Sequence, residues 1–185
     1  MKPTLPVRPK DESQLIQRAQ QHDSAAFGEI YHRYAQSIFQ YFYYRTGETQ
    51  TAEDLTAEVF LRALESISTY QDRGFPLSVW LFRIAHARLI DHWRRTQRRP
   101  QVELEDEQMG VHAYVEEPSG DVLADQELLV ALRQLTDDQY QVLALRFVQD
   151  LDNTTVATIL GKTEGAVKSL QHRALASLAR LLGGQ

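Results

Sequence analysis

Apolar side chains recur at helical spacing along two long stretches of the chain, residues 11–99 and 125–182. Polar and glycine-containing breaks divide the first stretch into four predicted helices, at residues 12–21, 24–45, 51–69 and 77–97. The second stretch predicts a helix at residues 126–134, another that begins after Thr136, and a closing helix pair. Thr136 and Gln139 have the spacing of a capping box, which marks a helix start. Because no segment alternates apolar and polar residues as a strand does, the sequence predicts an all-α fold.

The segment between these stretches has a different composition. Residues 100–125 contain Gly110, Pro118 and Gly120 and lack clear periodicity, so they are predicted to be a linker. The chain carries 20 basic and 25 acidic residues, a net charge of -5, but residues 101–125 hold 8 of the acidic residues and no basic one. The acidity therefore belongs to the linker, and both flanking segments remain able to meet DNA. We expect two small helical domains on a flexible acidic linker, preceded by a disordered tail at residues 1–10.

Composition excludes several classes of function. With no cysteine, the chain can form neither disulfides nor thiolate metal sites, and it is compatible with the cytosol. No apolar run approaches the ~18 residues that cross a bilayer, and the polar N-terminus has no signal peptide. The histidines share no ligand spacing, and no phosphate loop, nucleophile elbow or carboxylate pair is present. We therefore expect no catalytic residue, cofactor, metal, small-molecule substrate or membrane insertion.

Residues 153–174 have the pattern of a helix-turn-helix, which binds double-stranded DNA. Gly161 suits the left-handed turn between the helices because it has no Cβ. The inner faces are predicted to be Val156, Ile159 and Leu160 in the first helix and Val167, Leu170 and Ala174 in the second. Pointing the other way are Lys168, Ser169, His172 and Arg173. Two packed helices with a solvated basic edge are the alternative, and Lys162 occupies a turn position that is usually apolar.

The predicted helix at residues 51–69 has two contrasting faces. Its inward side chains are expected to be Val59, Phe60, Ala63, Leu64 and Ile67. The opposite face carries Asp54, Glu58, Leu61 and Glu65. This face is either an ordinary acidic surface with one stray leucine, or a docking face for a basic partner helix. In the second case Leu61 is the apolar anchor and the carboxylates steer the encounter.

The predicted helix at residues 77–97 is apolar around most of its circumference, so much of it should be buried. Arg83, Ala87 and Arg94 form one narrow stripe, with Trp80 at its edge, after a loop at residues 70–76. Arginines beside aromatic rings suit single-stranded or partly melted DNA. Phe82 and Trp93 are expected in the core, and Asp91 has Arg88, Arg94 and Arg95 as possible ion-pair partners.

The chain resembles the extracytoplasmic-function sigma factors of the sigma-70 family. The resemblance rests on three segments that have the order and separation found in that family, at residues 52–63, 80–95 and 164–175. The resemblance covers residues 13–182 and implies region 2 at residues 11–99 and region 4 at residues 126–182. It implies that the helix with Asp54, Glu58, Leu61 and Glu65 binds the clamp helices of core RNA polymerase. Residues 140–147 would help to seat region 4 on the polymerase flap, and the acidic linker would imitate RNA near the exit path.

The same resemblance assigns DNA-reading residues. Those implied for the minus-10 element and its opened strand are Tyr70, Arg73, Phe75, Trp80, Arg83, Ala87 and Arg94. Those implied for the minus-35 element are Lys168, Ser169, Gln171, His172 and Arg173. Two positions depart from many relatives: Ala87 replaces an asparagine, and Leu170 followed by Gln171 shifts the apolar position by one residue.

A sigma factor of this kind acts through coupled binding. We expect the free domains to collapse on each other and hide their DNA-binding surfaces, and polymerase to hold them apart at promoter spacing. An anti-sigma factor is an expected partner. Two other functions remain open: a repressor or activator that binds operators without polymerase, and a helical adaptor that binds only protein.

Overall fold

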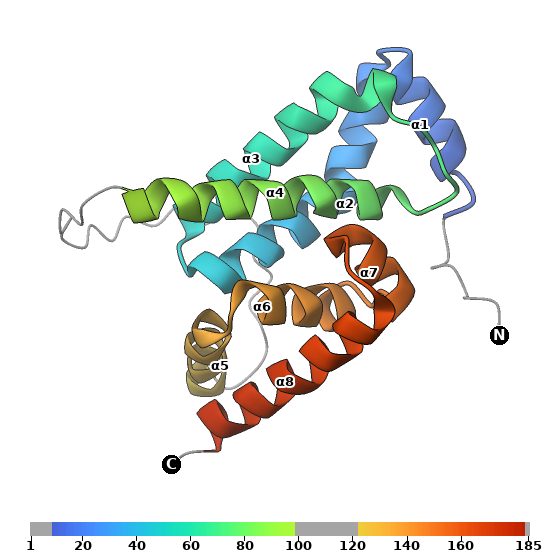
Figure 1. Ribbon diagram of the computed structural model, residues 1–185. Helices are drawn as coiled ribbons and strands as arrows, with labels where there is room; N and C mark the ends of the chain where they lie inside the picture. Colours follow the sequence, from blue (N-terminus) through green and yellow to red (C-terminus); the bar gives the residue numbers. More distant parts are fainter. Residues whose placement is uncertain (1–8, 99–121, 184–185) are drawn as a thin grey trace.

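The computed structural model describes residues 9–98 and 122–183, and every regular element in these ranges is helical (Figure 1). The N-terminal elements are α1 (Glu12–Gln20), α2 (Ser24–Thr46), α3 (Thr49–Ser66), a 3-10 turn (Ile67–Thr69) and α4 (Leu77–Arg98). The C-terminal elements are α5 (Val122–Gln134), α6 (Asp137–Leu143), a π-helical turn (Ala144–Val148), α7 (Asn153–Leu160) and α8 (Glu164–Leu182). The all-α prediction is confirmed. The predicted linker and N-terminal tail lie largely outside the described residues, although α5 begins at Val122, within the predicted linker.

In the N-terminal half, α3 packs against α2 and α4 around one apolar core. Phe82 is fully buried there, as predicted, whereas Trp93 packs against the core from a half-buried position. The inward prediction for Leu64 is wrong, because its side chain is 52% exposed. Position 64 lies three residues after Leu61, so both side chains emerge on the same side of α3.

The C-terminal half is built on α8, which packs against α5, α6 and α7. Thr136 and Gln139 form the predicted capping box at the start of α6. Gly161 has φ +64° and ends α7 in the left-handed conformation, as predicted. Both expected inner faces are confirmed, with Leu160 alone half-buried. The fully buried members are Val156, Ile159, Val167, Leu170 and Ala174.

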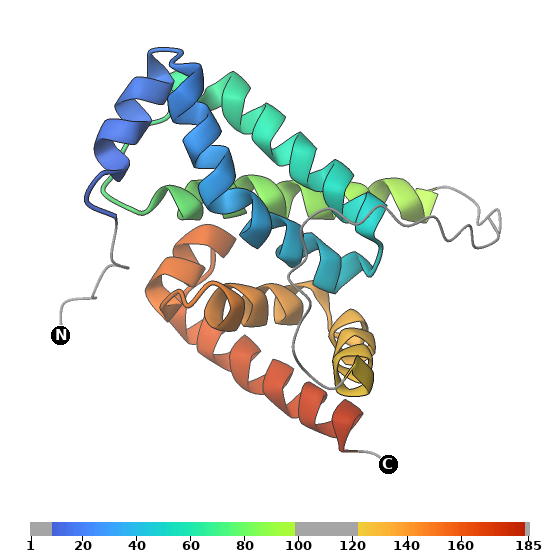
Figure 2. The same ribbon diagram turned by 180° about the vertical axis from the view of Figure 1, so that it is seen from behind.

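The two halves contact each other along α4 and the C-terminal end of α2. Helix α7 packs against α4, and α5 packs against α2. Figures 1 and 2 show α4 and the C-terminal end of α2 lying next to the helices of the C-terminal half. Within the described ranges, no helix is long and apolar enough to cross a membrane.

Candidate functional site

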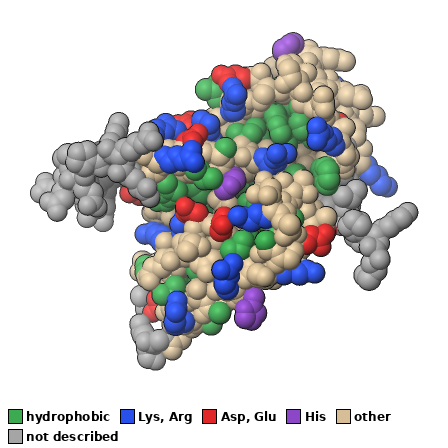
Figure 3. Space-filling model, viewed as in Figure 1, with side chains coloured by type: hydrophobic (Ala, Val, Ile, Leu, Met, Phe, Trp, Pro, Cys, Tyr) green, Lys and Arg blue, Asp and Glu red, His purple; other side chains and the backbone are tan. Residues whose placement is uncertain are grey.

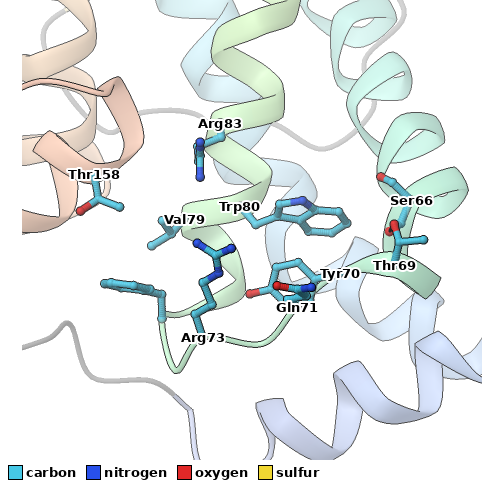
Figure 4. Close-up of a pocket in the computed structure, with 10 residues that line it drawn as sticks. Ser66, Thr69, Tyr70, Gln71, Arg73, Val79, Trp80, Arg83 and Thr158 are labelled. Atoms are coloured by element: carbon cyan, nitrogen blue, oxygen red, sulfur yellow. Dashed lines mark hydrogen bonds between the residues drawn. The ribbon is translucent and has the colours of Figure 1, made fainter.

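A pocket of about 450 Å³ opens between the loop after α3 and the first turns of α4. Tyr70 and Trp80 form one wall, with their ring centroids 4.7 Å apart (Figure 4). The lining residues are Ser66, Thr69, Tyr70, Gln71, Arg73, Phe75, Val79, Trp80, Arg83 and Thr158. The sequence-predicted residues 70, 73, 75, 80 and 83 are thus brought together in one hollow. Its volume is in the range of small-ligand pockets.

A buried carboxylate fixes the entrance of α4. Glu12, which is fully buried in α1, accepts a hydrogen bond from the Leu77 backbone N–H at 3.1 Å and another from the Tyr34 hydroxyl. A negative charge is favourable at this end of a helix, where the first N–H groups have no partner within the helix. Burial, followed by the bond to Glu12, raises the pKa of Tyr34. Glu12 therefore positions the pocket loop, and the sequence did not indicate it because its partner is 65 residues away.

Two further contacts shape the pocket loop. The Gln20 side-chain amide donates to the Tyr70 carbonyl at 2.7 Å, which ties the loop to α1. The Asp72 carboxylate accepts from the Gly74 N–H at 2.9 Å, and Gly74 has φ +80°, a conformation that side chains other than glycine rarely adopt. The loop is therefore held in a defined turn rather than left unsupported.

The predicted stripe of α4 lies at the surface. Arg83, Ala87 and Arg94 are exposed. Within the described ranges, no carboxylate lies within ion-pair distance of Arg73 or Arg83, so their charges face solvent beside the pocket. Three arginines were possible ion-pair partners for Asp91. In the structure its carboxylate pairs with the guanidinium of Arg88, with a nitrogen-to-oxygen distance of 2.9 Å.

The recognition face of the helix-turn-helix is also exposed. Lys168, Ser169, His172 and Arg173 point to solvent, whereas Gln171 is half-buried beside them. The expectation that domain collapse hides this face is therefore wrong: the N-terminal half packs against α7 and leaves these side chains accessible. Basic side chains are spread over the surface that carries α4 and α8 (Figure 3).

Lys162, the unusual residue in the turn, has a structural explanation. Its ammonium group pairs with the Asp138 carboxylate of α6 at 3.0 Å. The lysine therefore ties the turn to α6 by an ion pair, whereas an apolar residue at this position would make the contact by packing.

The outer face of α3 is more apolar than the sequence indicated. Leu61 is 60% exposed, Leu64 is 52% exposed, and on α2 Tyr31 is 45% exposed with its ring edge-on to Phe60 at 4.8 Å. We call Tyr31, Leu61 and Leu64 the apolar patch. Asp54 and Glu65 are exposed as predicted, whereas Glu58 is half-buried and lies 3.7 Å from Arg95. The spacing of Leu61 and Leu64 could have revealed part of this patch; Tyr31 gave no signal, because it lies on another helix.

Residues 140–147 offer less free surface than expected. Tyr140, Val142, Leu143, Ala144 and Leu145 are all buried, Tyr140 against Tyr41 of the other half. Phe147 and Val148, in the π-helical turn, are exposed. Contact between this segment and another protein is therefore limited to its C-terminal end.

The described histidines do not cluster with other metal-ligating side chains. In the parts of the chain that the structure describes, no group of three metal-ligating side chains is present. Burial lowers the pKa of His86 and of His92, which favours the neutral imidazole at both positions.

Both halves of the chain are similar to known proteins. Residues 30–99 match the Sigma-70 region 2 family and residues 131–180 match Sigma-70, region 4. The chain is 40% identical over 172 residues to the ECF RNA polymerase sigma factor BldN of Streptomyces coelicolor, covering 91% of this chain and 65% of BldN. It is 31% identical over 170 residues to SigX of Bacillus subtilis, covering 83% of this chain and 82% of SigX.

Two solved structures share the fold. CnrH in complex with the cytosolic domain of CnrY has a TM-score of 0.73 at 21% identity, covering 95% of this chain and 99% of CnrH. The sigma factor RpoE, in complex with the anti-sigma factor NepR from Bartonella quintana, has a TM-score of 0.69 at 23% identity, covering 85% of this chain and 96% of RpoE.

Proposed function

Because the chain belongs to the extracytoplasmic-function RNA polymerase sigma factors of the sigma-70 family, we propose that separate exposed surfaces bind polymerase, the minus-10 element and the minus-35 element. Such a protein has no catalytic site of its own; it recognises promoters and initiates transcription with RNA polymerase. The observation that carries this proposal is the apolar patch on α3 and α2, because exposed apolar side chains beside carboxylates are suited to a protein partner.

The outer face of α3 binds core polymerase. Leu61 and Leu64 supply the apolar anchor, and Asp54 and Glu65 steer a basic partner helix toward it. Glu58 contributes less to this contact, since Arg95 lies beside its carboxylate. The patch is therefore assigned to the polymerase clamp helices, and Phe147 with Val148 to the flap.

The pocket beside α4 receives an extruded base of the minus-10 element. Tyr70 and Trp80 offer aromatic faces for stacking, and Arg73 and Arg83 neutralise phosphates next to the opened strand. Ala87 lies on the same stripe, but its side chain has no hydrogen-bonding group. It therefore contacts the DNA by shape and not by a hydrogen bond to the edge of a base. Arg94 extends the basic track further along α4.

Helix α8 reads the minus-35 element in the major groove. Lys168, Ser169, His172 and Arg173 form the reading face, and Gln171 lies at its edge. An anti-sigma factor is a further partner, in keeping with the complex of RpoE and NepR. Since polymerase and promoter DNA share the cytoplasm, we place the protein there.

Binding to purified core polymerase tests the assignment of α3. Leu61→Arg puts a like charge opposite a basic partner and should weaken binding by more than about tenfold. Leu182→Arg is the matched control, because Leu182 is an exposed leucine at the far end of α8. If the Leu61→Arg variant and the native chain bind polymerase equally well, the outer face of α3 is not part of the polymerase interface.

A second experiment separates a sigma factor from a protein-binding adaptor. Replacing Lys168 and Arg173 by alanine removes two exposed cations of α8 without touching its buried face. We expect promoter-dependent transcription to be lost while binding to core polymerase is retained. Unchanged transcription would favour the adaptor.

A further inference from the structure

Arg45, in the last turn of α2, is only 9% exposed, and its hydrogen-bond acceptors among the described residues lie in the other half of the chain. Its guanidinium donates to the backbone carbonyls of Leu132, Arg133 and Leu135 at 3.2, 3.1 and 2.9 Å. It also pairs with the Asp137 carboxylate at 2.5 Å. The contact therefore joins the C-terminal end of α2 to the connection between α5 and α6.

These acceptors are suited to a cation. The last carbonyls of a helix have no partner within the helix, and the negative end of the helix dipole favours positive charge there. Arg45 thus caps α5 from the other domain. The planar guanidinium lies near the rings of Tyr140 and Trp93, at 5.4 and 5.8 Å from their centroids. A buried guanidinium needs such partners, since without them its desolvation is costly.

Neighbouring contacts close the same boundary. The Tyr140 hydroxyl donates to the Tyr41 carbonyl, and the two rings lie 5.7 Å apart. Gly47, which ends α2 with φ +74°, has the Arg133 guanidinium in the space that a Cβ would occupy. At the opposite end of the boundary, Thr158 of α7 forms part of the pocket wall beside α4 (Figure 4).

This packing conflicts with simultaneous reading of both promoter elements. The minus-10 and minus-35 positions are roughly 25 base pairs apart, which is about 85 Å along B-form DNA. In the structure α4 contacts α7, so the two reading units are held side by side. The closed chain can therefore engage one element, but not both.

We propose that Arg45 is an interdomain lock that holds the free chain in this closed form. The consequence for promoters rests on the proposed function, whereas the lock itself does not. Because the apolar patch stays exposed in the closed form, polymerase docks on the closed chain first and opening follows. The lock sets both the open population of the free chain and the free energy that opening costs once polymerase has docked.

Fluorescence energy transfer between the two halves of the full chain tests the lock. The sequence has no cysteine, so Thr49→Cys and Ala176→Cys, both at exposed positions, provide unique dye sites on either side of the boundary. Arg45→Met should raise the ratio of open to closed molecules about tenfold or more. Asp137→Asn, which removes the negative charge of one exposed partner but keeps an oxygen that can accept a hydrogen bond, should give a smaller shift in the same direction.

The matched control is Arg33→Met. Arg33 also makes two short ion pairs, with Asp11 and Glu29, but both partners lie in its own domain. We expect Arg33→Met to leave the transfer efficiency unchanged. If Arg45→Met fails to fold, as judged by circular dichroism, Asp137→Asn carries the test. A transfer distribution identical to the native one in the folded variants would overturn the lock.

Titration with core polymerase adds the functional consequence. Unlocking should tighten the apparent dissociation constant up to about tenfold, because less binding free energy is spent on opening. A shift in transfer efficiency without any polymerase binding would leave the lock standing and overturn the proposed function. If the unlocked variants bind polymerase but show the native transfer efficiency, the lock is overturned and the proposed function stands.

Discussion

At the scale of single residues, the pocket depends on a group that touches no proposed ligand. The carboxylate of Glu12 lies between α1, Tyr34 and the first turn of α4, and it joins segments that are far apart in the sequence. Its geometry makes it a positioning residue for the pocket loop, since Leu77 follows that loop directly.

Glu12→Gln should destabilise the fold by about 1–3 kcal/mol, because a neutral amide loses the favourable charge at the N-terminus of α4 and fits its donors less well. Urea unfolding measures this change. Glu29→Gln is the control, since Glu29 is an exposed acid that pairs with Arg33 on the surface. Equal midpoints for the two variants would contradict the role given to Glu12.

Features that a single helix or turn determines could be predicted from the sequence. The exposure of Leu61 and the turn at Gly161 both follow from local spacing and backbone preference. Leu64 was misplaced because it lies near the border between the two faces, where packing of α2 rather than periodicity decides exposure. Glu12 could not be found at all, since nothing local indicates its partners.

At the scale of elements, periodicity predicted the helices well because each has a strong apolar face. Helix α8 is the clearest case: Val167, Leu170 and Ala174 are buried and the basic residues opposite them are exposed. The π-helical turn at Ala144–Val148 was not predicted, since its side chains keep the pattern of an ordinary helix end.

Lys168→Ala should change the salt dependence of promoter binding. If Lys168 contacts one phosphate, the slope of log affinity against log salt falls by about 0.9 in the holoenzyme. Filter binding or anisotropy over a salt series measures it. Arg180→Ala, an exposed cation in the last turn of the same helix, serves as control and should leave the slope unchanged.

At the scale of the whole molecule, the sequence predicted two domains and a collapsed free form, but not how the domains meet. Arg45 and Asp137 are 92 residues apart, and neither lies at a position that periodicity singles out. Backbone carbonyls, which every residue carries, provide most of the acceptors for Arg45. A contact of this kind leaves no mark in a single sequence.

Acidification should open the molecule through His86. This histidine lines the cleft between the halves, together with Asp137, Asp138, Lys162 and Arg173. Its pKa lies below the ordinary value of 6.5, first because of burial; Asp138 opposes the shift and Lys162 adds to it. The open form therefore binds protons more readily, so the closed form is fully favoured above pH 6.5 and loses stability as pH falls below that value.

The energy-transfer pair described above measures this opening between about pH 7.5 and about pH 5.5. In the native chain the open population should grow on acidification. In His86→Asn, which has no titrating imidazole at this position, it should grow less. Identical pH profiles for the two proteins would assign the effect to other groups.

Promoter opening tests the central claim most directly. Purified chain and core polymerase would be mixed with a library of promoters, and permanganate would report unpaired thymines. We predict reactive thymines just upstream of start sites only when both proteins are present, and their loss in Asp54→Arg and Leu61→Arg. Binding of the chain to duplex DNA without polymerase, with no opening under any condition, would contradict the account and identify a repressor instead.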